Sequence, residues 1–200
     1  ICEIMLPDGT MARLPDLVKI AKEHNMKIGT ISDLIAYRNK HDNMLVQRDD
    51  RMVSSAYGGE WRMRVFEDQI SGTDHVVLSK GEISDGAPVL TRTHALNALE
   101  DVLGLGRGAP DELPRAMRII AEEGRGAVLL FREPNPRLRL DGDDDAAPRT
   151  IKRTGLGAQI LASLNVHELI LLTDNPRTKY TGLEAYNLKI VGHRPITKEA

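Results

Sequence analysis

The chain has a single cysteine, Cys2, among its 200 residues. One thiol cannot form a disulfide within the chain, and it cannot supply the several thiolates of a cysteine-rich zinc site. We therefore expect a protein suited to a reducing compartment, the cytoplasm. Cys2 could be a reactive thiol, but we favour a small apolar residue buried at a strand end.

Aromatic residues are also scarce, at 4% of the chain, and Trp61 is the single tryptophan. The core must therefore consist mainly of Leu, Ile, Val and Met side chains. No apolar run approaches the roughly 18 residues of a membrane-spanning helix, so we expect no membrane segment. The formal net charge of −2 gives no basic excess for binding nucleic acid.

The chain begins Ile-Cys-Glu-Ile-Met, without an initiator Met or a signal-peptide pattern. We expect it to be a fragment of a longer protein. Apolar spacing in the first part predicts a strand at 1–5, a helix from Leu14 to about Asn25, a strand at 27–31 and a helix capped by Ser32 and Asp33. Residues 41–58 carry many charges and few apolar side chains, which is typical of a linker.

The second part alternates strands and helices after residue 110, which favours an α/β fold. The predicted strands lie near 60–66, 75–81, 87–92, 127–131, 167–173 and 188–191, and the helices at 111–124, at 157–164 and around Leu183. Gly124-Arg125-Gly126 should end a helix, with Arg125 complementing its dipole. The acidic run Asp141 to Asp145 could bind a divalent cation, but a solvated loop is favoured.

Two stretches resemble known families. Residues 1–38, with the hexamer DGTMAR after CEI, closely resemble the C-terminal end of 3,4-dihydroxy-2-butanone 4-phosphate synthase. Glu3 matches a glutamate that handles the sugar phosphate in that family. The resemblance implies a role for Glu3 only in a longer parent protein, whose missing part would also hold magnesium.

The second stretch, from about His75 to Pro195, resembles GTP cyclohydrolase II in "HVVLSKGEISDGAPVLTRTH", "IAEEGRG" and "GLGAQILASLNVHELILLTDNP". The resemblance implies an α/β (α+β mixed) domain with a mixed sheet flanked by helices, preceded by a synthase tail, and a homodimer. The predicted organisation is a synthase tail at 1–40, a linker at 41–58 and a cyclohydrolase-like domain at 59–200.

The zinc segment of that family is altered here. In the family, R-x-H-S-E is followed by a cysteine and then a C-x-C pair, and three thiolates hold a zinc that activates water. This chain has Ala95 and Leu96 at the Ser and Glu positions. The three thiolate positions hold Asn97, Gly108 and Pro110. The resemblance therefore implies that zinc is absent from this domain and that it has no other cofactor.

Two further family segments differ. The family's R-Q-E-G-R run reads Arg132-Glu133-Pro134-Asn135-Pro136 here and keeps only its leading arginine. The segment that gives the family a catalytic aspartate and arginine is largely replaced by the acidic loop. Arg149, Lys152 or Arg153 could mimic the arginine, but no residue replaces the aspartate.

Some nucleotide-binding positions persist, and arginine groups at a strand end suit phosphate. The candidates for weak residual GTP or phosphate binding are Arg92, His94, Arg107, Arg132, Thr173 and Lys179, the last if Thr178 is an inserted residue. His75 and His94 could also ligate a metal. Neither has a second ligand at a helix or strand spacing, so structural roles are favoured.

These observations lead to one hypothesis with two alternatives. The resemblances imply a riboflavin-biosynthesis protein whose cyclohydrolase-like domain is catalytically inactive and serves a structural or dimerisation role for the synthase. Alternatively, the domain is an active GTP cyclohydrolase II with a non-standard metal or none. The third interpretation is a nucleotide-binding regulatory domain.

Overall fold

The computed structural model describes residues 2–31, 33–34, 37, 45–105, 111–133, 147–178, 180 and 183–197, with the backbone alone for 147–154. Its strands are β1 (Leu45–Ser55), β2 (Gly59–Asp68), β3 (Thr73–Lys80), β4 (Val89–Ala95), β5 (Gly126–Phe131), β6 (Glu168–Leu172) and β7 (Lys189–Arg194). Its helices are α1 (Leu14–Glu23), α3 (Ala98–Asp101), α4 (Glu112–Glu123), α5 (Ala147–Ser163) and the 3-10 helix η1 (Leu183–Tyr186).

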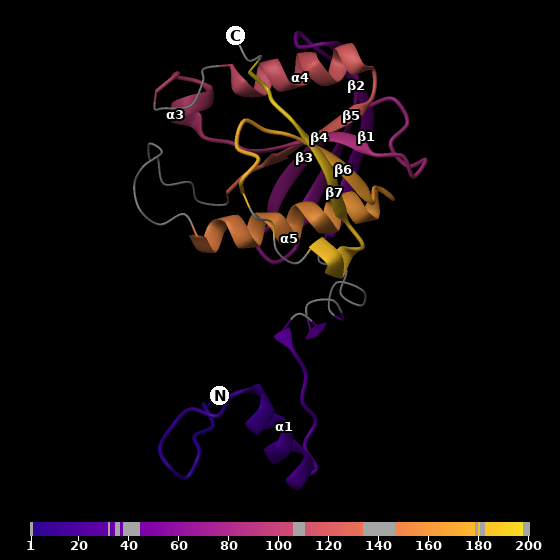
Figure 1. Cartoon of the computed structure of the whole chain (residues 1–200). Coiled ribbons are helices and arrows are strands. Elements are labelled where there is room, and N and C mark those ends of the chain that lie inside the picture. Colours follow the sequence, from indigo (N-terminus) through magenta and orange to yellow (C-terminus); the bar gives the residue numbers. More distant parts are fainter. Residues whose placement is uncertain are drawn as a thin grey trace.

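One mixed sheet organises the domain, with strand order β1-β2-β3-β5-β4-β6-β7. The first three strands form an antiparallel meander, and β3 pairs antiparallel with β5. Within the run β5-β4-β6-β7, each strand is parallel to the next. The chain passes through α4 in one direction, from β4 to β5, and then through α5 back over β4 to β6. Right-handed crossovers in opposite directions place these helices on opposite faces, as Figure 1 shows.

Each face of the sheet has its own apolar core. The alternation of side chains along β5 directs Val128 towards α4, and Ala127 and Leu129 towards α5. The core under α4 includes Trp61, Leu90, Ala116, Met117, Ile120, Leu172 and Ile196. The core under α5 includes Phe66, Val77, Val89, Phe131, Ala158, Ile160, Leu161, Leu169 and Leu171. The predicted mixed sheet flanked by helices is therefore confirmed.

The turn from α4 into β5 uses Arg125 in a way that the sequence did not indicate. Gly124 ends α4 in the left-handed conformation (φ 74°), as predicted. The prediction that Arg125 complements the dipole of this helix is wrong, because its guanidinium contacts the β3–β4 loop instead. It donates from Nε to the Glu82 carbonyl at 2.6 Å and from Nη1 to the Pro88 carbonyl at 2.7 Å.

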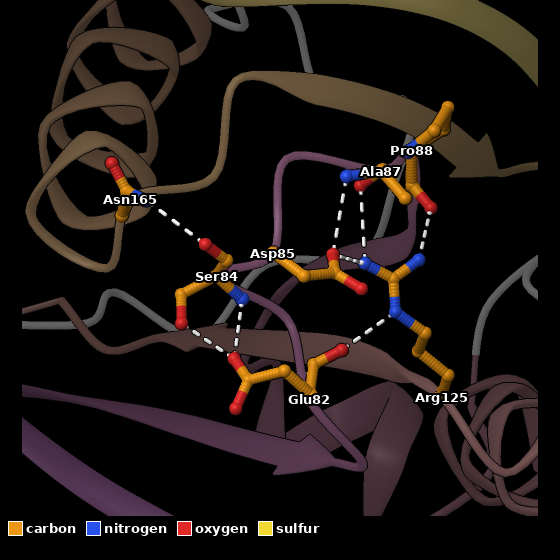
Figure 2. Close-up of polar contacts among 7 residues, drawn as sticks. All are labelled: Glu82, Ser84, Asp85, Ala87, Pro88, Arg125 and Asn165. Carbon is orange, nitrogen blue, oxygen red and sulfur yellow. Dashed lines mark hydrogen bonds and ion pairs between the residues drawn. The ribbon is translucent and has the colours of Figure 1, made fainter.

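The remaining Arg125 contacts go to the same β3–β4 loop (Figure 2). Nη2 donates to the Ala87 carbonyl at 3.1 Å and forms an ion pair with Asp85. Asn165, which follows α5, donates from Nδ2 to the Ser84 carbonyl at 2.9 Å. Loop 82–88 is thus fastened from two elements that lie far away in the sequence.

The linker prediction is wrong for residues 45–55, which form β1. The charges of this segment pair with β2: Asp50 accepts from Arg62 Nε at 2.7 Å and from Arg64 Nε at 3.3 Å. The Arg62 hydrogen bond holds the pKa of Asp50 below its usual range. Alternating charge is common on an edge strand, because it blocks pairing with other chains. The same polarity made the segment resemble a linker.

The N-terminal segment follows the predictions only in part. Helix α1 lies where it was expected, and Figure 1 shows it well apart from the sheet. The strand predicted at 27–31 is absent there, because Thr30 instead caps a helical turn and accepts the Asp33 N–H on Oγ1 at 3.0 Å. Residues 2–4 form no regular strand, and the single bridge nearby joins Met5 and Met11. Cys2 is exposed, so its predicted burial is wrong.

Candidate functional site

The carboxyl ends of the parallel strands β4, β5 and β6 lie at one edge of the sheet, where α/β proteins usually bind ligands. His94, Arg132 and Thr173 lie at or just beyond these ends. The structure therefore brings three of the predicted nucleotide-binding residues to this edge of the sheet. Arg107, Gly108, Pro110, Lys179, the acidic loop and the Arg149, Lys152 and Arg153 side chains lie outside what is described.

Arg92 extends from β4 towards the α4 face, where two of its guanidinium nitrogens contact other residues of the protein. Nη2 forms an ion pair with Glu112 Oε1 at 2.6 Å, and Nη1 donates to the Leu172 carbonyl at 3.2 Å. The side chain is 13% exposed. Its Nε is buried and has no hydrogen-bond partner in the part of the chain that the structure describes. One donor of the guanidinium therefore remains unused.

His94 is held by a carboxylate of α3. Its Nε2 lies 2.8 Å from Asp101 Oδ1, and the side chain is 8% exposed. The other Asp101 oxygen accepts the Asn97 N–H at 2.8 Å. Asp101 thus joins the end of β4 to the start of α3. Across the described ranges, no three His, Cys, Asp or Glu side chains group as metal ligands would.

Asn97, at the first thiolate position of the resembled family, is the N-cap of α3. Its Oδ1 accepts the Leu99 N–H at 3.1 Å, which satisfies a backbone donor at the helix start. Asparagine is among the preferred N-cap residues for this reason. The Asn97 side chain, predicted to occupy a thiolate position, therefore stabilises local backbone structure.

Thr173 and Asp174 shape the turn after β6. Thr173 donates its N–H to the Arg194 carbonyl at 2.9 Å, and its Oγ1 accepts the Asn175 N–H at 3.1 Å. Asp174 Oδ1 accepts the N–H groups of Ile196 and Thr197 at 2.7 and 3.0 Å. The sequence analysis missed Asp174, although an aspartate directly after a buried strand is a known turn signal.

The pKa of Asp174 results from opposed effects. Partial desolvation raises it, but hydrogen bonds from Thr197 and Ile196 outweigh this, and the nearby Arg92 charge lowers it further. The net pKa lies below the usual value. Asp174 is therefore a second negative group, beside Glu112, in the electrostatic surroundings of Arg92.

We expect Asp174→Ala to lower the free energy of unfolding by about 1 kcal/mol at neutral pH, a small value because the residue is exposed. A depressed folded-state pKa stabilises the fold above the unfolded pKa of about 3.9, and this stabilisation is lost as the pH falls through the folded value. In urea unfolding the difference between wild type and variant should shrink in that range. A difference independent of pH would contradict this account; Asp174→Asn, which keeps the acceptor, is the control.

The other predicted site residues make few side-chain contacts at the carboxyl edge of the parallel strands. Arg132 is exposed, and its backbone N–H donates to His75 Nδ1 at 3.3 Å. The His75 ring packs edge-on against Phe131. Glu3 is exposed and precedes α1, in the segment that Figure 1 shows apart from the sheet. The structure does not bring Glu3 to the Arg92 site.

Comparison with known proteins identifies the family of each part of the chain. Residues 46–195 match the family model of GTP cyclohydrolase II, and residues 1–37 match that of 3,4-dihydroxy-2-butanone 4-phosphate synthase. The chain belongs to the GTP cyclohydrolase II family. The cyclohydrolase match begins within β1, in agreement with its place in the sheet. Both predicted resemblances are therefore confirmed.

Similar proteins carry both segments. The monofunctional riboflavin biosynthesis protein RIBA 2, chloroplastic, of Arabidopsis thaliana is 36% identical over 98% of this chain and 43% of its own length. The riboflavin biosynthesis protein RibBA of Bacillus cereus is 36% identical over 100% of this chain and 55% of its own. The chain thus spans about half the length of these relatives.

A solved structure also matches, with a TM-score of 0.60 and 29% identity over 96% of this chain and 53% of that one. It is RibBX of A. baumannii, described as a two domain 3,4-dihydroxy-2-butanone 4-phosphate synthase. One relative is named as chloroplastic, so a cytoplasmic location for this GTP cyclohydrolase II family member stays a prediction. Of its described helices, none has the length and apolarity to cross a membrane.

Proposed function

We propose that the GTP cyclohydrolase II-like domain of this chain does not open GTP. It serves instead as a structural or dimerisation domain of a riboflavin-biosynthesis protein that carries a butanone-phosphate synthase. One observation supports this above the others. Asn97, at the first thiolate position, is the N-cap of α3, and the chain's single cysteine, Cys2, lies in the synthase-like segment.

The chemistry of ring opening explains why this matters. In the family a zinc held by three thiolates lowers the pKa of bound water to about 7 and so supplies hydroxide at neutral pH. A chain with one cysteine cannot build that site. Asn97, Gly108 and Pro110 offer no thiolate, and the Asn97 amide oxygen is used by the Leu99 backbone. This domain therefore has no comparable means of activating water.

The surroundings of Arg92 also oppose the binding of a triphosphate. Two of its guanidinium nitrogens are engaged by Glu112 and by the Leu172 carbonyl, and Asp174 adds a second negative charge nearby. A phosphate would have to displace Glu112 and approach two carboxylates. A phosphate–arginine pair is charge-assisted too, so it gains little over the Glu112 pair that it replaces, and the two carboxylates repel the phosphate. Any GTP binding should therefore be weak.

The N-terminal segment and the relatives support a structural role. Leu14, Val18 and Leu34 are exposed apolar side chains on the synthase-like segment, as expected for surfaces that pack against further protein. The matching solved structure is described by its synthase activity alone. We propose that the parent protein of this chain is likewise a synthase, and that it forms a homodimer.

A second candidate function rests on Arg92 Nε, the buried donor without a described partner. An anion could bind there and make the domain a nucleotide-binding regulator, or an active cyclohydrolase that uses another metal or none. A GTP titration distinguishes the regulator, which binds without turnover, from the structural domain.

Formate release from GTP, with added Zn²⁺ or Mg²⁺, distinguishes the enzyme from both. We expect no formate above the protein-free background from the wild type or from Arg92→Ala, because water activation and proton transfer are both missing. Wild-type turnover that Arg92→Ala abolishes would overturn the proposal and establish the enzymatic alternative.

A further inference from the structure

A cavity of about 180 Å³ lies on the α5 side of the sheet, across β4 from the Arg92 ion pair. Its lining residues come from strands β4, β5, β6 and β7, from α5, and from Thr178, Tyr180 and the start of η1. It is lined by Thr93, His94, Ala95, Phe131, Gly157, Ala158, Leu161, Leu169, Leu171, Thr178, Tyr180, Leu183 and Ile190. An engineered cavity of about 150 Å³ lined by Leu, Ile and Phe stays dry and binds benzene, so this space suits one small ring system.

The described lining is apolar with three hydroxyl groups. Those of Thr93, Thr178 and Tyr180 make no hydrogen bond to any other residue of the described ranges. No Lys, Arg, Asp or Glu appears among the described lining residues. His94 contributes to the wall, but its Nε2 is engaged by Asp101. An apolar space with a few convergent polar groups is the usual form of a small-molecule site.

Gly157 helps to keep this space open. A Cβ at this position of α5 would lie 3.0 Å from Phe131 Cζ and would press on the ring that forms the neighbouring wall. Glycine costs helix stability of about 1 kcal/mol relative to alanine. Its presence next to the cavity is therefore accounted for by the close packing of Phe131.

We propose that this cavity binds a small, flat, uncharged heteroaromatic compound that carries no phosphate group. The apolar side chains would contact the ring faces, and the Thr93, Thr178 and Tyr180 hydroxyls would bond to ring heteroatoms as donors or acceptors. The lining that is described offers no cation for a phosphate. This inference does not depend on the proposed function: His94 and Ala95 line the cavity, but Asn97 and Arg92 do not, so its ligand would bind whether or not GTP is opened.

The test uses indole, a neutral bicyclic heteroaromatic probe, titrated into the 200-residue chain by calorimetry. We expect saturable 1:1 binding. Leu183→Trp fills the cavity from the half-buried residue that lines it, and should abolish binding. Leu103→Trp adds the same side chain at a residue that is 62% exposed, and should bind as wild type. Circular dichroism of both variants checks that they are folded.

A second variant tests the hydroxyl contacts without altering the shape. Thr93→Val should weaken indole binding by roughly 2-fold to 10-fold, the loss of one hydrogen bond. No heat of binding up to the solubility limit of indole, or binding that neither Leu183→Trp nor Thr93→Val weakens, would overturn the proposal. Displacement of indole by GTP would also overturn it, because the cavity would then be a nucleotide site.

Discussion

Incubated with excess Zn²⁺ and then dialysed, the chain is expected to retain far less than one zinc ion per chain. Structural zinc sites in small domains bind with apparent free energies of about 10–16 kcal/mol at neutral pH, largely through thiolates and imidazoles. The sequence resemblance predicts that Asn97, Gly108 and Pro110 occupy the family positions for these thiolates. His94 is already paired with Asp101, and no cluster of three suitable ligands exists within the described ranges.

Elemental analysis of the dialysed protein measures this directly. Cys2→Ser is the matched control, because Cys2 is an exposed thiol that could retain some metal without any site in the cyclohydrolase-like domain. Zinc near zero in both proteins is the expected result. One zinc per chain in wild type and in Cys2→Ser alike would show that the domain holds metal by another ligand set.

Replacing Arg125 by methionine should lower the free energy of unfolding by about 2 kcal/mol, because hydrogen bonds from charged donors to backbone carbonyls are lost together. The guanidinium contacts the carbonyls of Glu82, Ala87 and Pro88 and pairs with Asp85. Methionine keeps much of the length of the side chain, so packing changes little. Partial exposure of Arg125 keeps the expected loss below the sum of the separate bonds.

Urea unfolding of Arg125→Met beside Arg177→Met tests this. Arg177 is exposed on the turn after β6, and its side chain makes no hydrogen bond or ion pair with another described residue, so its replacement should change the unfolding free energy by less than about 0.5 kcal/mol. Equal effects of the two substitutions would show that loop 82–88 does not depend on the Arg125 contacts.

The apolar elements could be predicted from the sequence, because burial leaves a local pattern. Strand β5 is apolar throughout and α4 carries a regular apolar stripe, so both were located to within one or two residues. Strand β1 was missed because an edge strand needs little apolar surface and carries paired charges instead. Helix α3 is only four residues long, and only its cap at Asn97 signals it.

The candidate site was predictable as a set of positions but not as a set of interactions. Motif comparison selected Arg92, His94 and Thr173 as candidates, and the structure shows that β4 and β6, which carry or precede them, are neighbouring parallel strands. Their partners could not be predicted, because Glu112 and the Leu172 carbonyl are 20 and 80 residues away from Arg92 in the chain. Arg125 was misassigned for the same reason, since its contacts lie about 40 residues away.

We propose that this domain keeps the cyclohydrolase fold without its ring-opening chemistry. The most direct test is formate release under single-turnover conditions, with the zinc-supplemented chain in excess over GTP so that even a very slow enzyme would convert the nucleotide. The account predicts that GTP is recovered intact, with formate at the level of a protein-free control. Formate in proportion to the GTP supplied, at a rate that rises with protein concentration, would contradict it.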